Sequence, residues 1–140
     1  MRSILLLNIL LIILATNTNA QIPTQLYNLL EDKDTTDLYF TLDQNPEFPG
    51  GRENLMKFYQ NNLYYPTSAR TNGIEGTVYI MFIVEEDGKL TNIKATNSVK
   101  RDVDKSAVRL VKKMPKWNPG EREGKVVRGL FVLPVTYRLN

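Results

Sequence analysis

Glu85, Glu86 and Asp87 are the carboxylates of this chain that could carry acid–base chemistry. Two carboxylates can act as general acid and general base when a cleft holds them beside a substrate. Here Asp87 precedes Gly88 between two apolar runs, and an Asp-Gly pair is the strongest short-range signal for a β-hairpin turn. A turn therefore explains this cluster better than an active site does.

Histidine and cysteine are both absent from the sequence. Their absence excludes a Ser–His–Asp triad, thiol catalysis, metal sites with His or Cys ligands, disulfides, and lipid attachment to an N-terminal cysteine. We therefore predict a protein that is not an enzyme, that holds no metal and no cofactor, and that takes no small-molecule substrate.

Basic residues concentrate near the C-terminus, where residues 100–128 carry ten Lys or Arg against four Asp or Glu. The formal net charge of the whole chain is only +3, a surplus too small to indicate a nucleic-acid partner. Two interpretations of the basic segment are open. It is the solvated face of a helix, or it attracts an acidic partner or an anionic surface.

A cleaved secretory signal peptide is predicted for residues 1–20. Arg2 provides the positive start, Ile4 to Ala15 the apolar run, and Thr18-Asn19-Ala20 the small residues before a cut. The apolar run has about 12 residues, against roughly 20 for a membrane-spanning helix. An uncleaved membrane anchor is the alternative. Residues 21–45 form a polar linker, in which Leu38 to Leu42 has the composition of a short strand.

The spacing of apolar residues predicts two helices and three strands in a domain of residues 46–140. The first helix begins at Gly50 or Gly51 and ends before Pro66, and the second is capped by Asp102 and ends at Pro115. The strands are Thr77 to Val84, Leu90 to Asn97, and a long strand after Gly120. We expect an α+β fold with a small three-stranded antiparallel sheet and two helices packed on one face, in the order helix-strand-strand-helix-strand.

The long final strand follows a corner that contains Pro115, Trp117, Pro119 and Gly120. We expect Trp117, the single tryptophan, to anchor this corner by packing. Pro134 lies inside the strand and cannot donate a hydrogen bond to a ladder, which is typical of sheet edges and strand ends. The last strand is therefore predicted at an edge, where unpaired backbone groups can dock another chain.

Several short motifs occur in an order and spacing that resemble the C-terminal domain of the TonB energy transducers. The resemblance covers about residues 46–140, including a Phe48-Pro-Gly-Gly51 entry typical of one subgroup. The motifs are Tyr65-Pro66, Gly73 to Val78, Asp87 to Lys89, Asp104 to Ala107, Met114 to Gly120, Gly124 to Val127, and Leu133 to Val135.

The resemblance implies a periplasmic domain that serves energy transduction and transmembrane transport. Such domains bind a short segment of an outer-membrane receptor, the TonB box, which adds as a strand beside their last strand. By position, the docking edge would comprise Val126, Val127, Arg128, Gly129, Leu130, Phe131, Val132 and Leu133. The turn that contains Tyr65, Pro66 and Arg70 would lie close to the incoming segment. In such β-augmentation, backbone hydrogen bonds supply affinity and alternate side chains supply selectivity.

Three interpretations of this chain remain. The first is a secreted periplasmic binding domain that acts as an adaptor, competitor or modulator. The second is a short transducer with an uncleaved anchor in the inner membrane, although a linker of about 25 residues reaches only roughly 90 Å when extended. The third is a self-associating domain, since related domains form homodimers through their terminal strands.

Overall fold

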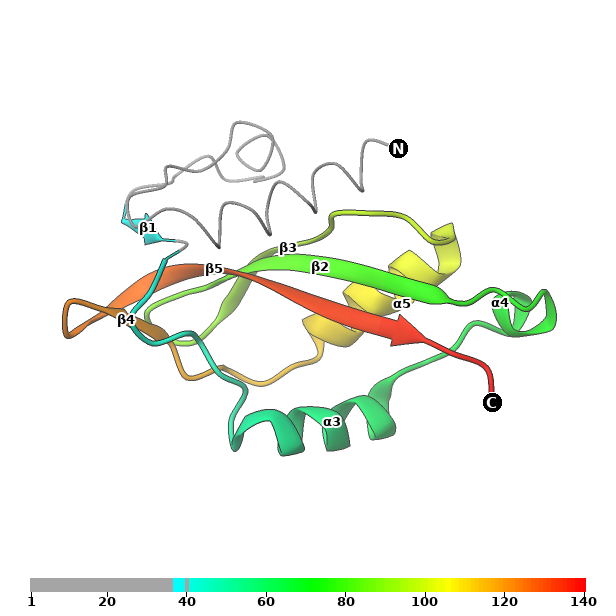
Figure 1. The fold of residues 1–140 in the computed structure, drawn as a ribbon, viewed down its shortest axis with the longest axis horizontal. Helices are drawn as coiled ribbons and strands as arrows, with labels where there is room; N and C mark the ends of the chain where they lie inside the picture. Colours follow the sequence, from blue (N-terminus) through cyan, green and yellow to red (C-terminus); the bar gives the residue numbers. More distant parts are fainter. Residues whose placement is uncertain (1–36, 40) are drawn as a thin grey trace.

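A mixed sheet of five strands organises the structure (Figure 1). The computed structural model describes residues 37–39 and 41–140, so the predicted signal peptide and most of the predicted linker lie outside the described residues. In chain order the elements are β1 (Leu38–Tyr39), α3 (Gly51–Asn62), α4 (Thr67–Thr71), β2 (Gly76–Val84), β3 (Leu90–Ala95), α5 (Arg101–Lys112), β4 (Gly120–Arg122) and β5 (Lys125–Tyr137).

Strand β5 is the longest strand and the one with most partners. It pairs antiparallel with β2 from Gly129 opposite Val84 to Tyr137 opposite Gly76, and β2 forms a hairpin with β3. The first residues of β5 pair antiparallel with β4 and in parallel with β1. The α+β class is confirmed. The prediction of a three-stranded antiparallel sheet describes β5, β2 and β3 but is wrong for the whole sheet, which is five-stranded and mixed.

The two additional strands, β1 and β4, could not be predicted for a physical reason. β1 has two residues and β4 has three, so neither shows a measurable alternation of apolar and polar side chains. Both also depend on β5 for their hydrogen bonds, which sequence spacing does not reveal. Because β1 pairs with β5 at Arg128 and Gly129, the outer side of the last strand is an edge along only part of its length. The short helix α4 was likewise predicted only as a polar turn.

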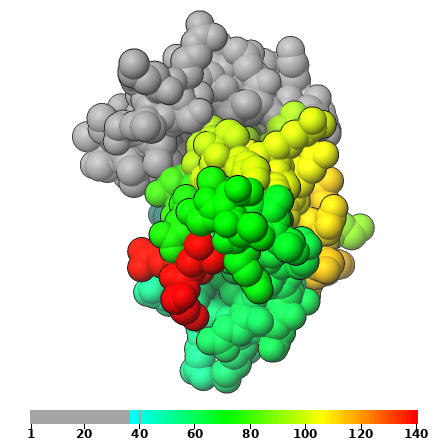
Figure 2. All heavy atoms as spheres, turned by 90° about the vertical axis from the view of Figure 1, so that its right-hand side faces the viewer, coloured from blue at the N-terminus to red at the C-terminus, as the bar shows by residue number. Residues whose placement is uncertain are grey.

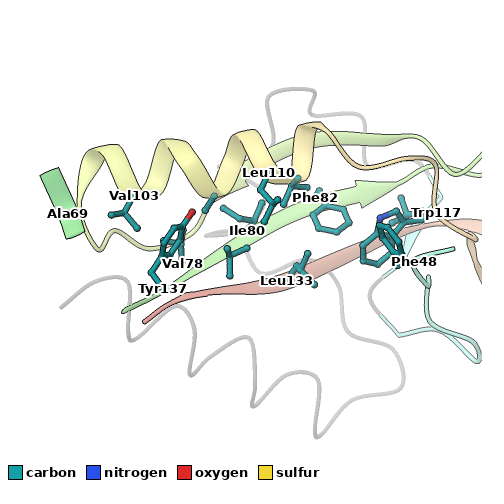
Figure 3. Close-up of a cluster of buried hydrophobic side chains, with 14 residues drawn as sticks. Phe48, Ala69, Val78, Ile80, Phe82, Val103, Leu110, Trp117, Leu133 and Tyr137 are labelled. Atoms are coloured by element: carbon teal, nitrogen blue, oxygen red, sulfur yellow. The ribbon is translucent and has the colours of Figure 1, made fainter. Parts of the chain in front are cut away.

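The hydrophobic core joins α3 and α5 to one face of the sheet. Val78, Ile80, Phe82 and Val84 alternate along β2 and are fully buried, as the pattern predicted. They meet α5 residues such as Leu110 (Figure 3), while α3 adds partly buried side chains to the same cluster: Leu55, Phe58, Tyr59 and the adjoining Leu63. Two helices on one face are thus as expected.

The helix boundaries follow backbone chemistry. Gly50 and Gly51 have φ of 79° and 77°, a left-handed conformation in which glycine is favoured, and α3 begins there as predicted. Helix α5 begins two residues earlier than expected, with Lys100 at the N-cap position instead of Asp102. The carboxylate of Asp104 accepts a hydrogen bond from the Val99 N–H and so satisfies a donor at this helix start.

Candidate functional site: the outer edge of β5

The outer edge of β5, meaning its side away from β2, contains most of the residues predicted to dock a partner. Val126 and Val127 pair with β4 on the β2 side of β5, whereas Arg128 and Gly129 stand opposite β1 on the outer side. Beyond Leu130, no strand among the described residues pairs with the outer edge. Among the eight predicted residues, β1 therefore covers the outer edge around Arg128 and Gly129, and the part beyond Leu130 is open.

The register of the sheet decides which backbone groups face this edge. The carbonyl of Tyr79 accepts a hydrogen bond from the Thr96 N–H at 2.8 Å, and the Tyr79 N–H donates to Asn97 Oδ1 at 2.8 Å. The backbone N–H and C=O of Tyr79 therefore face β3 and not β5. Pro134 stands opposite Tyr79, and the two residues form a non-hydrogen-bonded pair. The backbone carbonyl of Pro134 therefore faces away from β2.

The alternation of an antiparallel strand extends this orientation along β5. Leu130, Val132 and Thr136 share the parity of Pro134, so their N–H and C=O groups face the outer edge, whereas Phe131 and Leu133 face β2. Pro134 thus occupies a position where no ladder hydrogen bond is lost, which was the basis for expecting it at an edge. Of the predicted edge residues, Val132 is the one whose N–H and C=O both face the open part.

Helix α3 contacts this edge through Tyr59. The Tyr59 hydroxyl donates a hydrogen bond to the Pro134 carbonyl at 3.2 Å. Burial, with a smaller contribution from Tyr137, raises the pKa of Tyr59 well above the usual range, so the hydroxyl stays protonated and remains a donor at physiological pH. Tyr59 also packs against the core, and only the fold reveals its contact with the edge.

The predicted partner-proximal turn lies at the C-terminal end of β5. The rings of Tyr65 and Tyr137 pack edge to face with their centroids 5.3 Å apart, and the Arg70 guanidinium lies 5.7 Å from the centre of the Tyr65 ring. Pro66 is buried and caps α4. Figure 2 shows the C-terminal residues in red at the surface, beside the green segment that includes α4. The structure therefore brings Tyr65 and Arg70 to one end of the edge.

An ion pair fixes the other end of the edge. Arg128 Nε lies 2.6 Å from Glu85 Oε2, Arg128 Nη2 lies 3.3 Å from Glu85 Oε1, and both side chains are largely buried. Thr91 also donates a hydrogen bond to Glu85. A two-pronged pair of this kind holds the end of β2 to the beginning of β5. Glu85, a candidate for acid–base chemistry, therefore has a structural role in the sheet.

The other carboxylates of that cluster belong to the predicted hairpin turn. Asp87 accepts a hydrogen bond from the Lys89 N–H, and this bond lowers the pKa of Asp87. The turn is also closed by a hydrogen bond from the Gly88 N–H to the Glu85 carbonyl. Among residues 37–39 and 41–140, no group of carboxylates is arranged to hold a metal ion.

Trp117 anchors the corner before β4 and β5. It is 4% exposed, and its ring packs edge to face with those of Phe82 and Phe131 at centroid distances of 5.2 and 5.3 Å. Its backbone N–H donates to the Gly88 carbonyl at 2.9 Å. Pro115 and Pro119 flank it in the segment between α5 and β4, and Gly120 begins β4. The indole is therefore a packing residue rather than a surface for a ligand.

The basic segment forms a second surface feature on α5. Val108 and the charged side chains Asp104, Lys105, Arg109 and Lys112 line a groove of about 460 Å³. The basic side chains there are exposed, while Asp102 beside them hydrogen-bonds to Ser68. That hydrogen bond is the main reason that the pKa of Asp102 is lowered. This arrangement agrees with a solvated helix face and does not by itself identify a ligand.

Comparisons with known proteins identify the family of this chain. The family described as the Gram-negative bacterial TonB protein C-terminal matches residues 61–139. Among solved structures, the chain is similar to the C-terminal domain of TonB from Helicobacter pylori, determined by NMR in solution. The identity is 26%, the TM-score is 0.47, and the similarity covers 66% of this chain and 87% of that one. No curated protein matches the chain. Within the described residues, no helix is long and apolar enough to span a membrane.

Proposed function

This chain belongs to the family of the C-terminal domain of the Gram-negative bacterial TonB protein, and we propose that it binds the TonB box of an outer-membrane transporter by adding it as a strand to the outer edge of β5. The family is non-enzymatic, lies in the periplasm, and is associated with TonB-dependent transport through interactions with outer-membrane transporters. The proposal for this chain concerns the peptide, the edge that takes it, and the mode of binding.

The observation that carries the proposal is the open part of the outer edge, from Val132 to Tyr137. Val132 and Thr136 direct their backbone N–H and C=O groups to this side, and no described strand pairs with them. Unpaired edges of this kind are templates for an added strand. Each backbone hydrogen bond that forms there contributes about 0.5–1.5 kcal/mol net.

The side chains beside the open edge suit an extended peptide with alternating contacts. Val132 is half-buried, whereas Pro134 and Thr136 are exposed on the face opposite the core. On the core side, Tyr59 lies against the strand and Tyr65 stands at its end. A bound strand would therefore place alternate side chains on these two sets of residues. Because the backbone supplies most of the contacts, the sequence of the peptide can vary.

A synthetic peptide with methylated backbone nitrogens tests this mode of binding. We expect a TonB-box peptide to bind the full chain in calorimetric titration. Methylation of the peptide nitrogens that face β5 should abolish binding, whereas methylation of the alternate nitrogens should leave the affinity within about threefold, because only the first set donates to the edge. Equal tolerance of both methylated sets would refute strand addition.

Two other experiments separate this proposal from its alternatives. Cell fractionation with N-terminal sequencing distinguishes a secreted periplasmic domain from an anchored transducer: Gln21 at the mature N-terminus supports secretion, and an intact Met1 in the inner membrane contradicts it. Light scattering with and without the peptide addresses self-association. If the outer edge of β5 pairs two copies, the peptide should dissociate the homodimer, because both ligands need the same edge.

A further inference from the structure

The first part of the outer edge of β5 is covered by a segment that comes before α3. We call residues 38, 39 and 41–47 the strap. Its first residues form β1, with Leu38 opposite Arg128 and Tyr39 opposite Gly129 in parallel. In Figure 1 this cyan segment runs from β1 past the start of β5 and β4 toward α3.

The rest of the strap pairs with β4 through backbone hydrogen bonds. The N–H groups of Asp43 and Gln44 donate to the Glu121 carbonyl at 2.9 and 3.1 Å, and the Glu121 N–H donates to Gln44 at 2.9 Å. Glu47 and Asn118 exchange two further bonds at 3.0 and 2.8 Å. The strap is therefore held in the way that an added peptide would be, by the backbone of an extended chain.

Two glycines form the floor beneath the strap. A Cβ atom at Gly120 would lie 2.5 Å from Leu42 Cδ1, and one at Gly129 would lie 2.8 Å from the same atom. Neither glycine has a positive φ, so the backbone conformation itself does not demand glycine at these positions. The close approach of Leu42 explains why glycine occupies both positions, since any larger residue would collide with it. The floor therefore leaves room for an extended segment.

Side chains add contacts to this backbone pairing. The Arg122 guanidinium lies 4.7 Å from the centre of the Tyr39 ring, and Asp43 Oδ2 accepts a hydrogen bond from the Glu123 N–H at 2.6 Å. Leu38 and Pro46 are buried, while Thr41, Asp43, Gln44 and Glu47 are exposed. Backbone pairing and the packing of Leu38, Leu42 and Pro46 therefore hold the strap in place.

The strap also interrupts an edge that would otherwise be longer. Arg122 and Lys125 flank the two-residue turn of the β4–β5 hairpin, so Val126 faces the outer edge together with Arg128 and Leu130. Val126 is 44% exposed. The parallel register sets Tyr39 between Arg128 and Leu130, so its backbone faces theirs. A partner strand along the predicted edge from Val126 to Leu133 would meet β1 at this point.

We propose that the strap is an internal ligand, and that the groove formed by the outer edge of β5, the β4 backbone and the Gly120–Gly129 floor accepts an extended peptide from a partner protein when the strap leaves. This inference rests on the proposed function for the identity of the partner and adds a second peptide-binding region to it. While the strap is bound, the partner reaches only the part of the edge beyond Leu130.

A variant of the full chain tests the displacement. Tyr39→Pro removes the β1 N–H that faces the Arg128 carbonyl and the ring that packs on Arg122. The probe is a fluorescently labelled synthetic peptide with this chain's own sequence from Thr36 to Glu47. We expect it to bind Tyr39→Pro at least about tenfold more tightly than the natural chain, since affinity for an occupied site falls with the fraction that is open. Tyr39→Phe, which keeps the N–H and the ring, should bind as the natural chain does.

Two further variants guard against misfolding and define the site. Leu42→Ala with Asp43→Ala weakens the strap without touching β1, and should also strengthen probe binding. Gly129→Val fills the floor and should block the probe in the Tyr39→Pro background, while thermal unfolding reports whether the fold persists. Equal probe affinity for the natural chain and both weakened variants, or no binding to any of them, would overturn the inference.

The same variants separate this inference from the proposed function. A TonB-box peptide should bind Tyr39→Pro more tightly than the natural chain, by about the factor seen with the probe. If the probe binds the opened variant and the TonB-box peptide does not, the groove stands and the proposed partner is wrong. If the TonB-box peptide binds all variants equally, the edge stands and the strap does not regulate it.

Discussion

Substitution of Val132 by proline tests the open edge at the first residue whose backbone N–H and C=O both face it. The Val132 N–H faces away from β2, so its removal costs no hydrogen bond within the sheet. Pro134, two residues later and with the same orientation, already occupies such a position in this chain. We therefore expect Val132→Pro to fold, with a loss of unfolding free energy of about 1 kcal/mol or less from the reduced side chain.

Peptide binding should respond much more strongly. The proline removes one donor and leaves a carbonyl of the bound peptide without its partner, which costs about 2–3 kcal/mol, or roughly 30- to 150-fold in affinity. Val132→Ala is the matched control, because it shortens the side chain and keeps the N–H. Its affinity should remain within about threefold of that of the natural chain.

Fluorescence anisotropy with a labelled TonB-box peptide measures both affinities, and thermal unfolding monitors the fold. Leu133→Pro supplies the opposite control, since the Leu133 N–H faces Ile80 in β2 and the side chain is buried. That variant should be strongly destabilised. The reasoning is refuted if folded Val132→Pro binds the peptide as tightly as Val132→Ala does.

Three other substitutions test the surroundings of the edge. Trp117→Ala should lower the unfolding free energy by about 3–5 kcal/mol in urea denaturation, as for a buried aromatic residue, and a change near zero would contradict its packing role. Tyr59→Phe removes the hydrogen bond to Pro134 and should cost about 1 kcal/mol of stability while leaving the peptide affinity unchanged or higher; weaker binding would show that the hydroxyl helps the partner. Because the Ser68 hydrogen bond lowers the pKa of Asp102 in the folded state, its stabilisation is present above the unfolded pKa near 4 and is lost as the pH falls below it. The melting temperature of Asp102→Asn should therefore fall less than that of the natural chain between about pH 4 and pH 2, and parallel curves would contradict the assignment.

The central elements of the fold could be predicted because their apolar residues recur with the period of a strand or of a helix. The apolar run from Val78 to Val84 predicted a strand, and its residues are buried in the structure except Tyr79, which is half-buried. Pro134 predicted a position where β5 needs no donor, and the register confirms that it faces away from β2. The motifs that resemble the TonB family predicted the family that the comparison shows.

The strap could not be predicted, because its contacts depend on residues far away in the chain. Leu38 to Leu42 was predicted as a short strand. Its partner, direction and register depend on β5, which lies about 90 residues further along the chain. Gly120 and Gly129 carry no periodic signal, and the reason for them appears only when Leu42 lies above both. The division of the predicted edge into a covered and an open part is likewise a property of the fold.

The amide exchange of β5 tests the central claim most directly. The N–H groups of Phe131, Leu133 and Val135 face β2 and should exchange slowly with or without a partner, whereas those of Val132 and Thr136 face the outer edge. With a saturating TonB-box peptide, the account predicts slower exchange at Val132 and Thr136 in NMR measurements on the full chain. Protection that appears instead at the basic groove of α5, with Val132 and Thr136 unchanged, would contradict strand addition at this edge.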